Sequence, residues 1–242
     1  MKANEWISSA TALYAIQQLA ENPVNNYMLA KADWYFIPIM NPDGFDYSHK
    51  QDHTWKKTRS RRVKTDNTCF GVDLNQNFDS GCNFTNLQNR SCNNGENSFS
   101  EPEANAMLDF LTKNFQVELF ININNYGQSI DYPLETDARY IDDNNDLKFV
   151  AEKASYAIYK YGGYKYTVNG FDSCGSEHWA RRQGIKYVYN IKLPAGEELG
   201  PKSQVPESEI LSIAQEVFVA FRQLQQILVS IYGVTYDLIT DD

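Results

Sequence analysis

Three asparagines stand at the end of an apolar, β-type run, where a strand of an α/β protein usually presents side chains to a site. Residues 118 to 123 read ELFINI, and Asn122, Asn124 and Asn125 are the polar residues at the end of this run. An amide side chain does not ionise near neutral pH, and its oxygen is a neutral, hard ligand. The strand end therefore carries no group for acid–base chemistry and is poorly suited to binding zinc.

Histidines are the next residues that could bind a metal or transfer a proton. The chain has three of them, His49, His53 and His178. His49 and His53 stand four residues apart, as two metal ligands on a helix can, but they lie in a polar stretch that we interpret as a loop. We therefore expect ordinary surface histidines rather than a metal site.

A basic cluster could attract a polyanion, although the chain as a whole has a formal charge of −9. Six of the nine residues from 56 to 64 are basic, and no second basic stripe accompanies them. A solvated loop and a polyanion contact are the two interpretations of this cluster, and the net charge argues against a nucleic-acid partner. The basic residues are Lys56, Lys57, Arg59, Arg61, Arg62 and Lys64.

Cysteines and glycosylation sequons lie together between residues 69 and 92. Cys69, Cys82 and Cys92 are close in sequence, and sequons begin at Asn83 and Asn89. Their coincidence is typical of a disulfide-bearing, glycosylated surface loop, and it favours a secreted protein. The chain as given shows no apolar core of a signal peptide, and no apolar stretch has the length of a membrane span.

Alternating helices and strands must position these residues. A length of 242 residues with 42% hydrophobic content favours one globular domain. The periodicity predicts helices over 9–21, 101–114, 144–161 and 206–231, and strands over 34–39, 117–124 and 186–193. Residues 41–44, Asn-Pro-Asp-Gly, predict a turn after the first strand, and residues 45–100 predict mostly long loops. The alternation predicts an α/β domain with helices on both faces of a sheet.

An ordered series of short motifs resembles the zinc metallocarboxypeptidases of the carboxypeptidase A/B family. The series comprises Asn4-Glu-Trp6, Pro38-Ile-Met-Asn-Pro-Asp-Gly44, Trp55-Lys-Lys-Thr-Arg59, Cys69-Phe-Gly-Val-Asp-Leu-Asn75 and Gly184-Ile-Lys-Tyr187. The resemblance implies a three-layer α/β/α sandwich with a mixed central sheet, which has eight strands in the complete family domain. It also implies a secreted protein that acts on the C-termini of peptides.

The resemblance fails at the positions where the family binds zinc. In the family a His-x-x-Glu pair and a later His bind the metal. These positions align here with Lys2, Glu5 and Asn124, so one carboxylate remains and both imidazoles are gone. The residue beside the first ligand, an arginine in the family, aligns with Asn4. The resemblance therefore implies a lost zinc site, and we expect no cofactor.

The other functional positions have changed in the same way. The family's general base aligns with Lys192, which cannot take a proton from water, and its oxyanion-stabilising arginine aligns with Lys56. The Asn-Arg pair that binds the substrate carboxylate aligns with Asn75 and Gln76, so the bidentate guanidinium contact is lost. Further family positions for substrate or catalysis align with Tyr126, Phe171 and Glu177, of which Glu177 stands where an acid favours basic C-terminal residues.

Three further expectations follow from this comparison. Without zinc, Glu5 needs a cation, and we expect Lys2 and Lys192 to form a Lys–Glu–Lys arrangement around it. Cys69 and Cys92 match a family disulfide, whereas Cys82 and Cys174 could form a second bridge or stay free. The chain also starts after the family's first strands, so we expect a carboxypeptidase-like domain over 1–232 that lacks them, followed by an acidic tail over 233–242.

The sequence thus favours a catalytically inactive carboxypeptidase-like protein that binds a peptide C-terminus or a protein partner. One alternative is an active zinc carboxypeptidase, which the missing ligands contradict. The other is a polyanion-binding module that acts through residues 56–64. We expect no nucleic-acid or membrane partner.

Overall fold

The computed structural model describes residues 1–63, 68–81, 95, 97–113, 116–134, 142–172, 174–194 and 205–232. Its helices are α1 (Trp6–Glu21), η1 (Pro23–Asn25), α2 (Asn26–Leu29), α3 (Pro42–Lys50), η2 (Leu74–Gln76), α5 (Pro102–Lys113), α6 (Asp143–Gly162), α7 (Ser176–Arg182) and α8 (Glu207–Tyr232). Its strands are β1 (Arg61–Val63), β2 (Thr68–Phe70), β3 (Leu119–Asn125), β4 (Ser129–Pro133), β5 (Thr167–Phe171) and β6 (Tyr187–Leu193). None of the described helices is long and apolar enough to cross a membrane.

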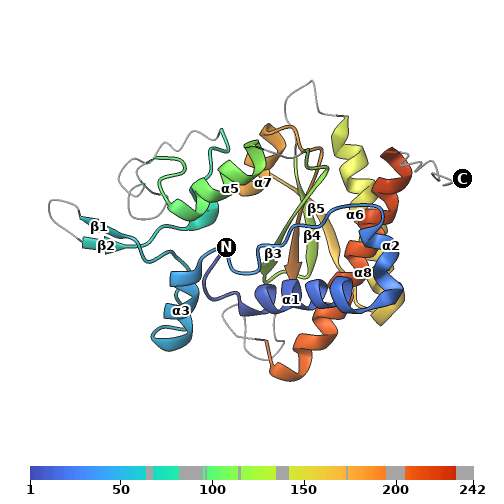
Figure 1. Ribbon diagram of the computed structural model, residues 1–242, viewed down its shortest axis with the longest axis horizontal. Helices are drawn as coiled ribbons and strands as arrows, with labels where there is room; N and C mark the ends of the chain where they lie inside the picture. Colours follow the sequence, from blue (N-terminus) through green and yellow to red (C-terminus); the bar gives the residue numbers. More distant parts are fainter. Residues whose placement is uncertain are drawn as a thin grey trace, which may run out of the picture.

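A mixed sheet of four described strands forms the centre of the molecule, in the order β3-β6-β4-β5. Strand β3 runs parallel to β6, β4 is antiparallel to β6, and β5 runs parallel to β4. Strands β1 and β2 form a separate antiparallel pair. Helices α6 and α8 lie on one side of the main sheet, and α5 and α7 lie on the other (Figure 1). The expected three-layer α/β/α sandwich with a mixed sheet is therefore confirmed.

Two apolar clusters occupy the two faces of this sheet. The first cluster joins α1, α6 and α8 to one face, and Ile121, Tyr189 and Ile191 point into it from the strands. The second joins α5 and α7 to the opposite face, where Phe120 and Val188 belong to it. The alternation of side chains along a strand accounts for this division, because successive residues point to opposite faces.

Most of the predicted elements are confirmed, with ends that differ by one or two residues. This holds for the helices predicted at 101–114, 144–161 and 206–231, and for the strands predicted at 117–124 and 186–193. The helix predicted at 9–21 begins earlier, at Trp6, and Glu5 is its N-cap residue. Ser9 lies inside this helix, and its hydroxyl donates to the carbonyl oxygen of Pro38 at 2.8 Å.

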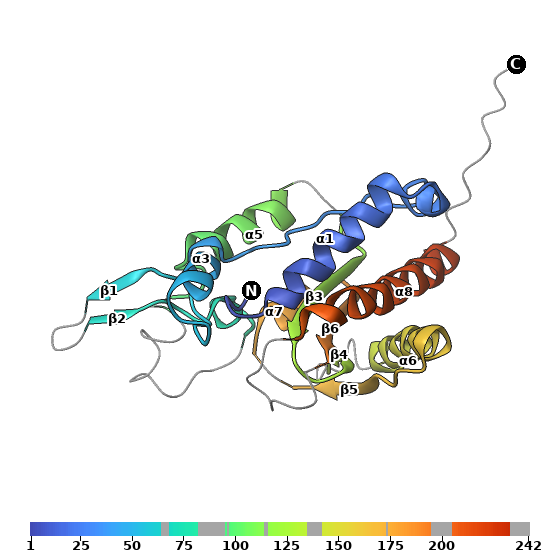
Figure 2. The ribbon, with the colours of Figure 1, turned by 90° about the horizontal axis from the view of Figure 1, so that it is seen from below.

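The strand predicted at 34–39 is wrong as a strand. Residues 32–37 have no regular secondary structure, although exposure alternates from residue to residue between 33 and 40. The alternation of aromatic and aliphatic side chains favours an extended chain, but a strand also needs a hydrogen-bonded neighbour. This extended segment crosses beside β3 between α2 and α3 (Figure 2).

The turn predicted at 41–44 is wrong as well, because these residues begin helix α3. The side-chain oxygen of Asn41 accepts a hydrogen bond from the backbone N–H of Gly44 at 3.0 Å, and Pro42 occupies the first turn. Asn followed by Pro is both a turn signal and a helix start, and here the helix prevails. The region 45–100 is consequently less irregular than predicted, because most of α3, and β1, β2 and η2, lie in it.

Candidate functional site

One face of the sheet carries Asn122 and Asn124 of β3 together with Lys192 of β6. Asn122 and Asn124 face away from the α6–α8 side, and in the strand register they oppose Asn190 and Lys192. The side-chain amide of Asn124 donates to the side-chain oxygen of Asn190 at 2.8 Å, and both residues are buried. The sequence-predicted positions 124 and 192 therefore lie side by side.

Lys192 forms an ion pair with Asp131 of β4, not with Glu5. Its Nζ lies 2.6 Å from Oδ2 of Asp131, whose side chain is 3% exposed. The other carboxylate oxygen of Asp131 accepts from the Asn169 amide of β5 at 3.0 Å. The predicted Lys–Glu–Lys arrangement is therefore wrong, because Lys192 pairs with Asp131 of β4, two strands away from β3.

Glu5 lies beside the end of β3 and keeps one of its two expected partners. Its Oε1 is 3.6 Å from Nζ of Lys2, and its side chain is 7% exposed. Burial raises the pKa of Glu5, whereas the charge of Lys2 and a hydrogen bond from the backbone of Asn125 oppose that rise. Lys2, Glu5 and Asn124 thus come together at one end of the sheet.

These three side chains do not fit a zinc ion. Catalytic zinc takes three imidazole or carboxylate ligands and one open position. Lys2 offers an ammonium directed at Glu5, and the Asn124 amide is hydrogen-bonded to Asn190. Within the described part of the chain, no group of three or more His, Cys, Asp or Glu residues is arranged to hold a metal. We therefore derive no chemical step through zinc at this site.

A second network joins Asn75 and Glu177, two of the residues predicted to bind substrate. Oδ1 of Asn75 accepts from the backbone N–H and the hydroxyl of Ser176, at 3.1 and 2.6 Å. Glu177 is 1% exposed, and its carboxylate accepts from the amide of Asn122 at 2.9 Å, from the hydroxyl of Ser176 at 3.2 Å and from the amide of Asn75 at 3.4 Å. The sequence placed Asn75 and Glu177 in one site, but it did not show that they bind each other.

The remaining predicted site residues surround these two networks less closely. Tyr126 follows β3 and is 49% exposed, and Gln76 ends the short helix η2. Phe171 ends β5, and its ring meets that of His178 edge-on at 5.4 Å. Lys56 contacts the N-terminal segment through its backbone: its carbonyl oxygen accepts a hydrogen bond from the N–H of Ala3 at 3.0 Å.

His49 lies in α3 rather than in the predicted loop, and both His49 and His53 pack against the indole of Trp6. The ring of His49 stacks on Trp6 with the centroids 3.8 Å apart, and His53 meets the same indole edge-on at 5.7 Å. Nδ1 of His53 lies 3.1 Å from the carbonyl oxygen of Ser48.

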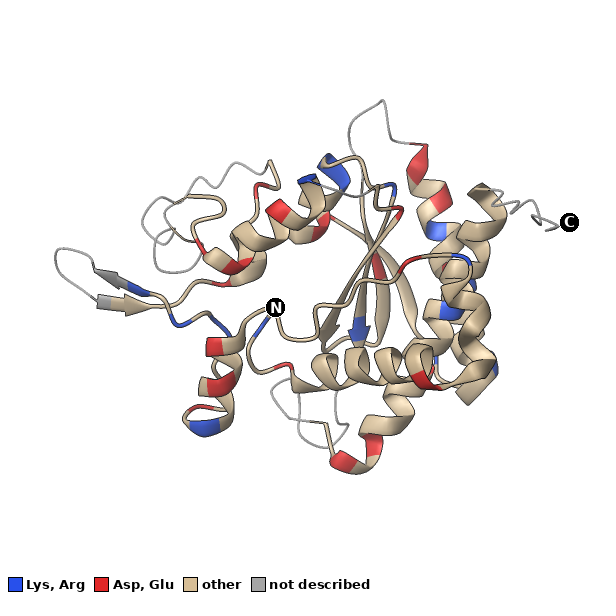
Figure 3. Cartoon of the chain, viewed as in Figure 1, with Lys and Arg blue, Asp and Glu red and all other residues tan. Residues whose placement is uncertain are grey.

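The basic cluster leads into β1, where Figure 3 shows basic residues along the chain. The guanidinium of Arg59 lies over the rings of Tyr47, Trp55 and Phe70, at 3.7, 4.5 and 5.1 Å from their centroids. Part of the cluster is thus engaged in cation–π packing. The polyanion contact stays a prediction, and Lys64 lies outside the described residues.

The described cysteines, Cys69 and Cys174, carry no free thiol. Cys82, Cys92 and the sequon asparagines Asn83 and Asn89 lie outside the described residues. The predicted pairing of Cys69 with Cys92 and the predicted glycosylation therefore stay predictions.

Three residues of the site carried a weaker signal in the sequence. Asp131 stands within the apolar run Ser129–Pro133, all five residues of which are buried, and an acid in such a run indicates a buried partner. Asn190 and Ser176 lie beside residues that were singled out, but a single amide or hydroxyl is too common to be distinguished from sequence alone.

Comparison with known proteins agrees with this arrangement. The family described as zinc carboxypeptidase matches residues 1–220. Carboxypeptidase A1 of Bos taurus is 31% identical over 230 residues, which are 89% of this chain and 54% of that protein. Carboxypeptidase A2 of Rattus norvegicus is 30% identical over 237 residues, which are 93% of this chain and 56% of that protein. The chain spans about half the length of these curated relatives.

Solved structures show the same fold. Bovine thrombin-activatable fibrinolysis inhibitor, in complex with tick carboxypeptidase inhibitor, superposes with a TM-score of 0.83 at 30% identity, covering 95% of this chain and 80% of that one. Carboxypeptidase A of Helicoverpa armigera has a TM-score of 0.82 at 22% identity, covering 96% of this chain and 60% of that one. The chain therefore belongs to the zinc carboxypeptidase family.

Proposed function

We propose that this chain is a catalytically inactive member of its family that binds the C-terminal segment of a peptide or of a protein. The ion pair between Lys192 and Asp131 is the observation that carries the proposal. A lysine at the family's general-base position, already bound to a buried carboxylate, can neither accept a proton from water nor move freely toward a substrate.

The neighbouring side chains support the same proposal. Asn124 and Lys2 stand at the two positions where the family has imidazoles, and each is engaged with a residue of this chain. The family's mechanism needs the metal and the base together, since the metal polarises the carbonyl and activates water. Replacing both removes the mechanism rather than slowing it.

Glu177 supports a ligand with a basic C-terminal residue. Its buried carboxylate accepts from two amides and a hydroxyl, all of them neutral donors. The longest of these three contacts is the hydrogen bond from Asn75, at 3.4 Å. A lysine or arginine side chain of a ligand would replace it with a charge-assisted hydrogen bond. We therefore propose that the recognised C-terminus is basic, and that the protein is secreted and meets such peptides outside the cell.

Zinc content tests the loss of catalysis. After dialysis, elemental analysis should find no stoichiometric zinc, because Glu5 alone is a weak site. The matched control is the double variant Lys2→His, Asn124→His, which places two imidazoles beside Glu5 and should gain zinc. One zinc per unaltered chain that resists dialysis would overturn the proposal.

Peptide binding and hydrolysis test the remainder. Blocked dipeptides that end in lysine, arginine or phenylalanine should all stay intact, and the lysine and arginine forms should bind more tightly than the phenylalanine form. Glu177→Gln should abolish that preference, because it removes the charge and retains the shape of the side chain. Hydrolysis that a chelator stops would favour the active enzyme, and equal binding of all three dipeptides would contradict the assigned role of Glu177.

A further inference from the structure

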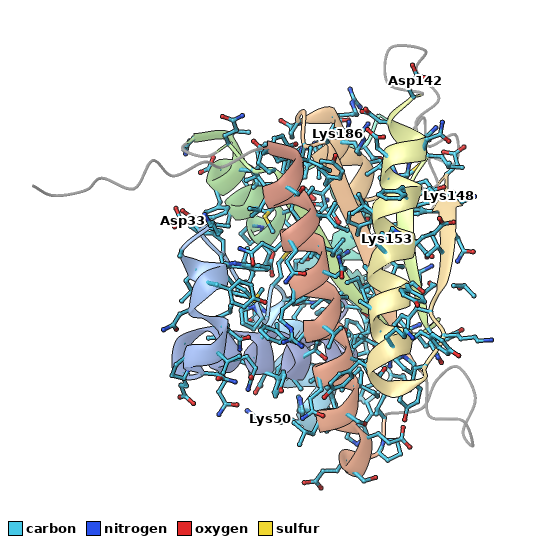
Figure 4. All side chains as sticks on the ribbon, turned by 90° about the vertical axis from the view of Figure 1, so that its right-hand side faces the viewer. Asp33, Lys50, Asp142, Lys148, Lys153 and Lys186 are labelled. Atoms are coloured by element: carbon cyan, nitrogen blue, oxygen red, sulfur yellow. The ribbon has the colours of Figure 1, made fainter. Side chains whose placement is uncertain are left out.

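Helix α6 has an outward face that the core does not use. Its buried residues, among them Leu147, Ala154 and Ile158, belong to the apolar cluster shared with α8. Residues on the opposite side of the helix are exposed and recur at intervals of three and four positions, as residues on one helix face do. We call them the α6 stripe, and Figure 4 labels two of them, the first and the fifth. The α6 stripe consists of Asp142, Asn145, Phe149, Glu152, Lys153, Tyr156 and Lys160.

Helix α6 stands at the end of the sheet that is far from the first residues of the chain. It packs on β4, β5 and α8, and β5 is at the opposite end of the strand order from β3. The first residues lie beside the end of β3, where Glu5 accepts a hydrogen bond from the backbone of Asn125 (Figure 1). The α6 stripe therefore lies on a different side of the molecule from the start of the chain.

Two aromatic side chains in the stripe are largely uncovered. Phe149 and Tyr156 are 54% and 56% exposed. The ammonium groups of Lys153 and Lys160 lie 5.1 and 5.7 Å from the centroids of these two rings, so each lysine covers only part of its ring. Aromatic residues are weaker helix formers than the polar residues usual on an outer helix face. Their repetition at the centre of the stripe indicates a surface that contacts a partner.

The charges of the stripe change sign along the helix. Asp142 and Glu152 precede Lys153 and Lys160, so the stripe is acidic toward its start and basic toward its end. Among the described residues, no acidic side chain forms an ion pair with either lysine. The two acids and two lysines make the stripe neutral, although the whole chain has a formal charge of −9. Such a stripe is complementary to a second copy of itself that runs in the opposite direction.

We propose that two copies of this chain associate through their α6 stripes, which run antiparallel about a two-fold axis. When the axis passes between Glu152 and Lys153, Glu152 of each copy faces Lys153 of the other. In the same register, Phe149 of each copy faces Tyr156 of the other. A two-fold axis forms every one of these contacts twice. The antiparallel arrangement also brings the positive N-terminus of each helix beside the negative C-terminus of the other.

The contacts of this register are favourable but cover a small area. Aromatic pairs attract one another beyond their buried area, and two such pairs lie on either side of the axis. Farther out, Lys160 of each copy lies within one helical turn of Asp142 of the other. Helix α6 has 20 residues and is therefore about 30 Å long, so the interface is smaller than the usual size of about 1,600 Å². The dimer is consequently weak and forms reversibly.

Sedimentation of the full chain at rising concentration tests the association. The dimer fraction should increase as the concentration is raised from about 1 µM to about 1 mM. The variant Phe149→Gln, Tyr156→Gln keeps the exposed helix and loses both aromatic pairs, so its dissociation constant should be about tenfold higher or more. A full chain that stays monomeric over the whole range would overturn the proposal.

Exchanging the two central charges tests the register. Lys153→Glu places two carboxylates opposite each other, and Glu152→Lys does the same with two ammonium groups, so each variant alone should raise the dissociation constant about tenfold or more. An equimolar mixture of the two variants should restore the dimer, because a glutamate again faces a lysine at both contacts. The double variant Glu152→Lys, Lys153→Glu should dimerise with itself for the same reason.

A control separates this contact from a general effect of charge. Lys50 of α3 is an exposed lysine in an ion pair with Asp46, and Lys50→Glu makes the same change of charge outside the stripe. This variant should dimerise like the unaltered chain, and circular dichroism should show that every variant keeps its helices. If the mixture of the two charge variants stays monomeric, or if Lys50→Glu weakens the dimer as much as Lys153→Glu does, the copies do not meet through the α6 stripe and the proposal is wrong.

Discussion

Asp131 gives the side chain of Lys192 a structural role. Its carboxylate is buried, and it receives the ammonium of Lys192 and the amide of Asn169. Burying a carboxylate without a partner is expensive, so a lysine that reaches it from the neighbouring strand stabilises the fold. Lys192 thus supplies the counter-charge of the buried Asp131.

Lys192→Met should lower the free energy of unfolding by about 2 kcal/mol, because it leaves Asp131 buried and unpaired. The effect is smaller than for a fully buried pair, since the side chain of Lys192 is 37% exposed. Denaturant melts measure it. The control is Lys148→Met on α6, where Figure 4 shows Lys148 on the outer side of the helix and its ion pair with Glu152 is exposed. That change should cost less than about 1 kcal/mol, and equal losses would contradict the role given to Asp131.

The residues of the site were predictable where a motif fixed their positions. The expectation that Lys2, Glu5, Asn124 and Lys192 converge rested on short ordered motifs, and the structure places all four near the end of β3. The partner of Lys192 was not predictable, because Asp131 lies in a strand that periodicity did not reveal. Which of two nearby carboxylates a lysine reaches depends on strand order, which a single sequence does not contain.

At the scale of elements, β5, α6 and α8 meet around a buried acid on α8. Glu216 is 2% exposed, and the hydroxyl of Tyr166 donates to its Oε2 at 3.4 Å. Burial raises the pKa of Glu216 to about 7, and the hydrogen bond from Tyr166 opposes the rise. Below a pH of about 7, the folded chain therefore favours the protonated form of this carboxyl.

The stability of the protein should consequently depend on pH through Glu216. Because the pKa is raised on folding from 4.5 to about 7, the contribution is fully present below pH 4.5 and is lost as the pH rises through about 7. The difference in unfolding free energy between the unaltered chain and Glu216→Gln should shift by about 2 kcal/mol across this range, after allowance for solvent screening.

Two further observations check this assignment of the pH dependence. Tyr166→Phe removes the hydrogen bond that opposes the rise, so it should move the transition to higher pH. If Glu216→Gln leaves the pH dependence of the melts unchanged, the assignment is wrong.

Helices were predictable where a long apolar period set them, as in α6 and α8. The short elements were not. Helix α7 has seven residues and β5 has five, too few for a period to stand out. Residues 34–39 carry a strand-like sequence, but strand formation depends on a hydrogen-bonded neighbour, and no described strand pairs with this segment.

At the scale of the whole molecule, two apolar clusters divide the stabilising contacts between the two faces of the sheet. The cluster on the α5–α7 face is the smaller one and adjoins the region of residues 68–81, which includes Cys69. A small cluster gains more from covalent constraint, since cross-links restrict the unfolded chain.

Non-reducing peptide mapping should find Cys69 linked to Cys92, and material secreted from cells should carry a glycan at Asn83 or Asn89. Reduction should lower the unfolding free energy by about 2–4 kcal/mol, because the loop closed by such a bond is moderately long. Alkylation of Cys69 and Cys92 as free thiols in the unreduced protein would contradict the pairing.

The contacts of Asp131 also have a mechanical consequence. The carboxylate of Asp131 on β4 binds Lys192 of β6 and Asn169 of β5, so its side-chain contacts link three adjacent strands. The parallel pair of β4 and β5 resists a pull along the strands in shear, where the ladder bonds share the load. A force that slides β5 out of the sheet must therefore break the hydrogen bond between Asn169 and Asp131 together with the backbone hydrogen bonds between β4 and β5. Pulling experiments should find a lower rupture force after Asp131→Ala.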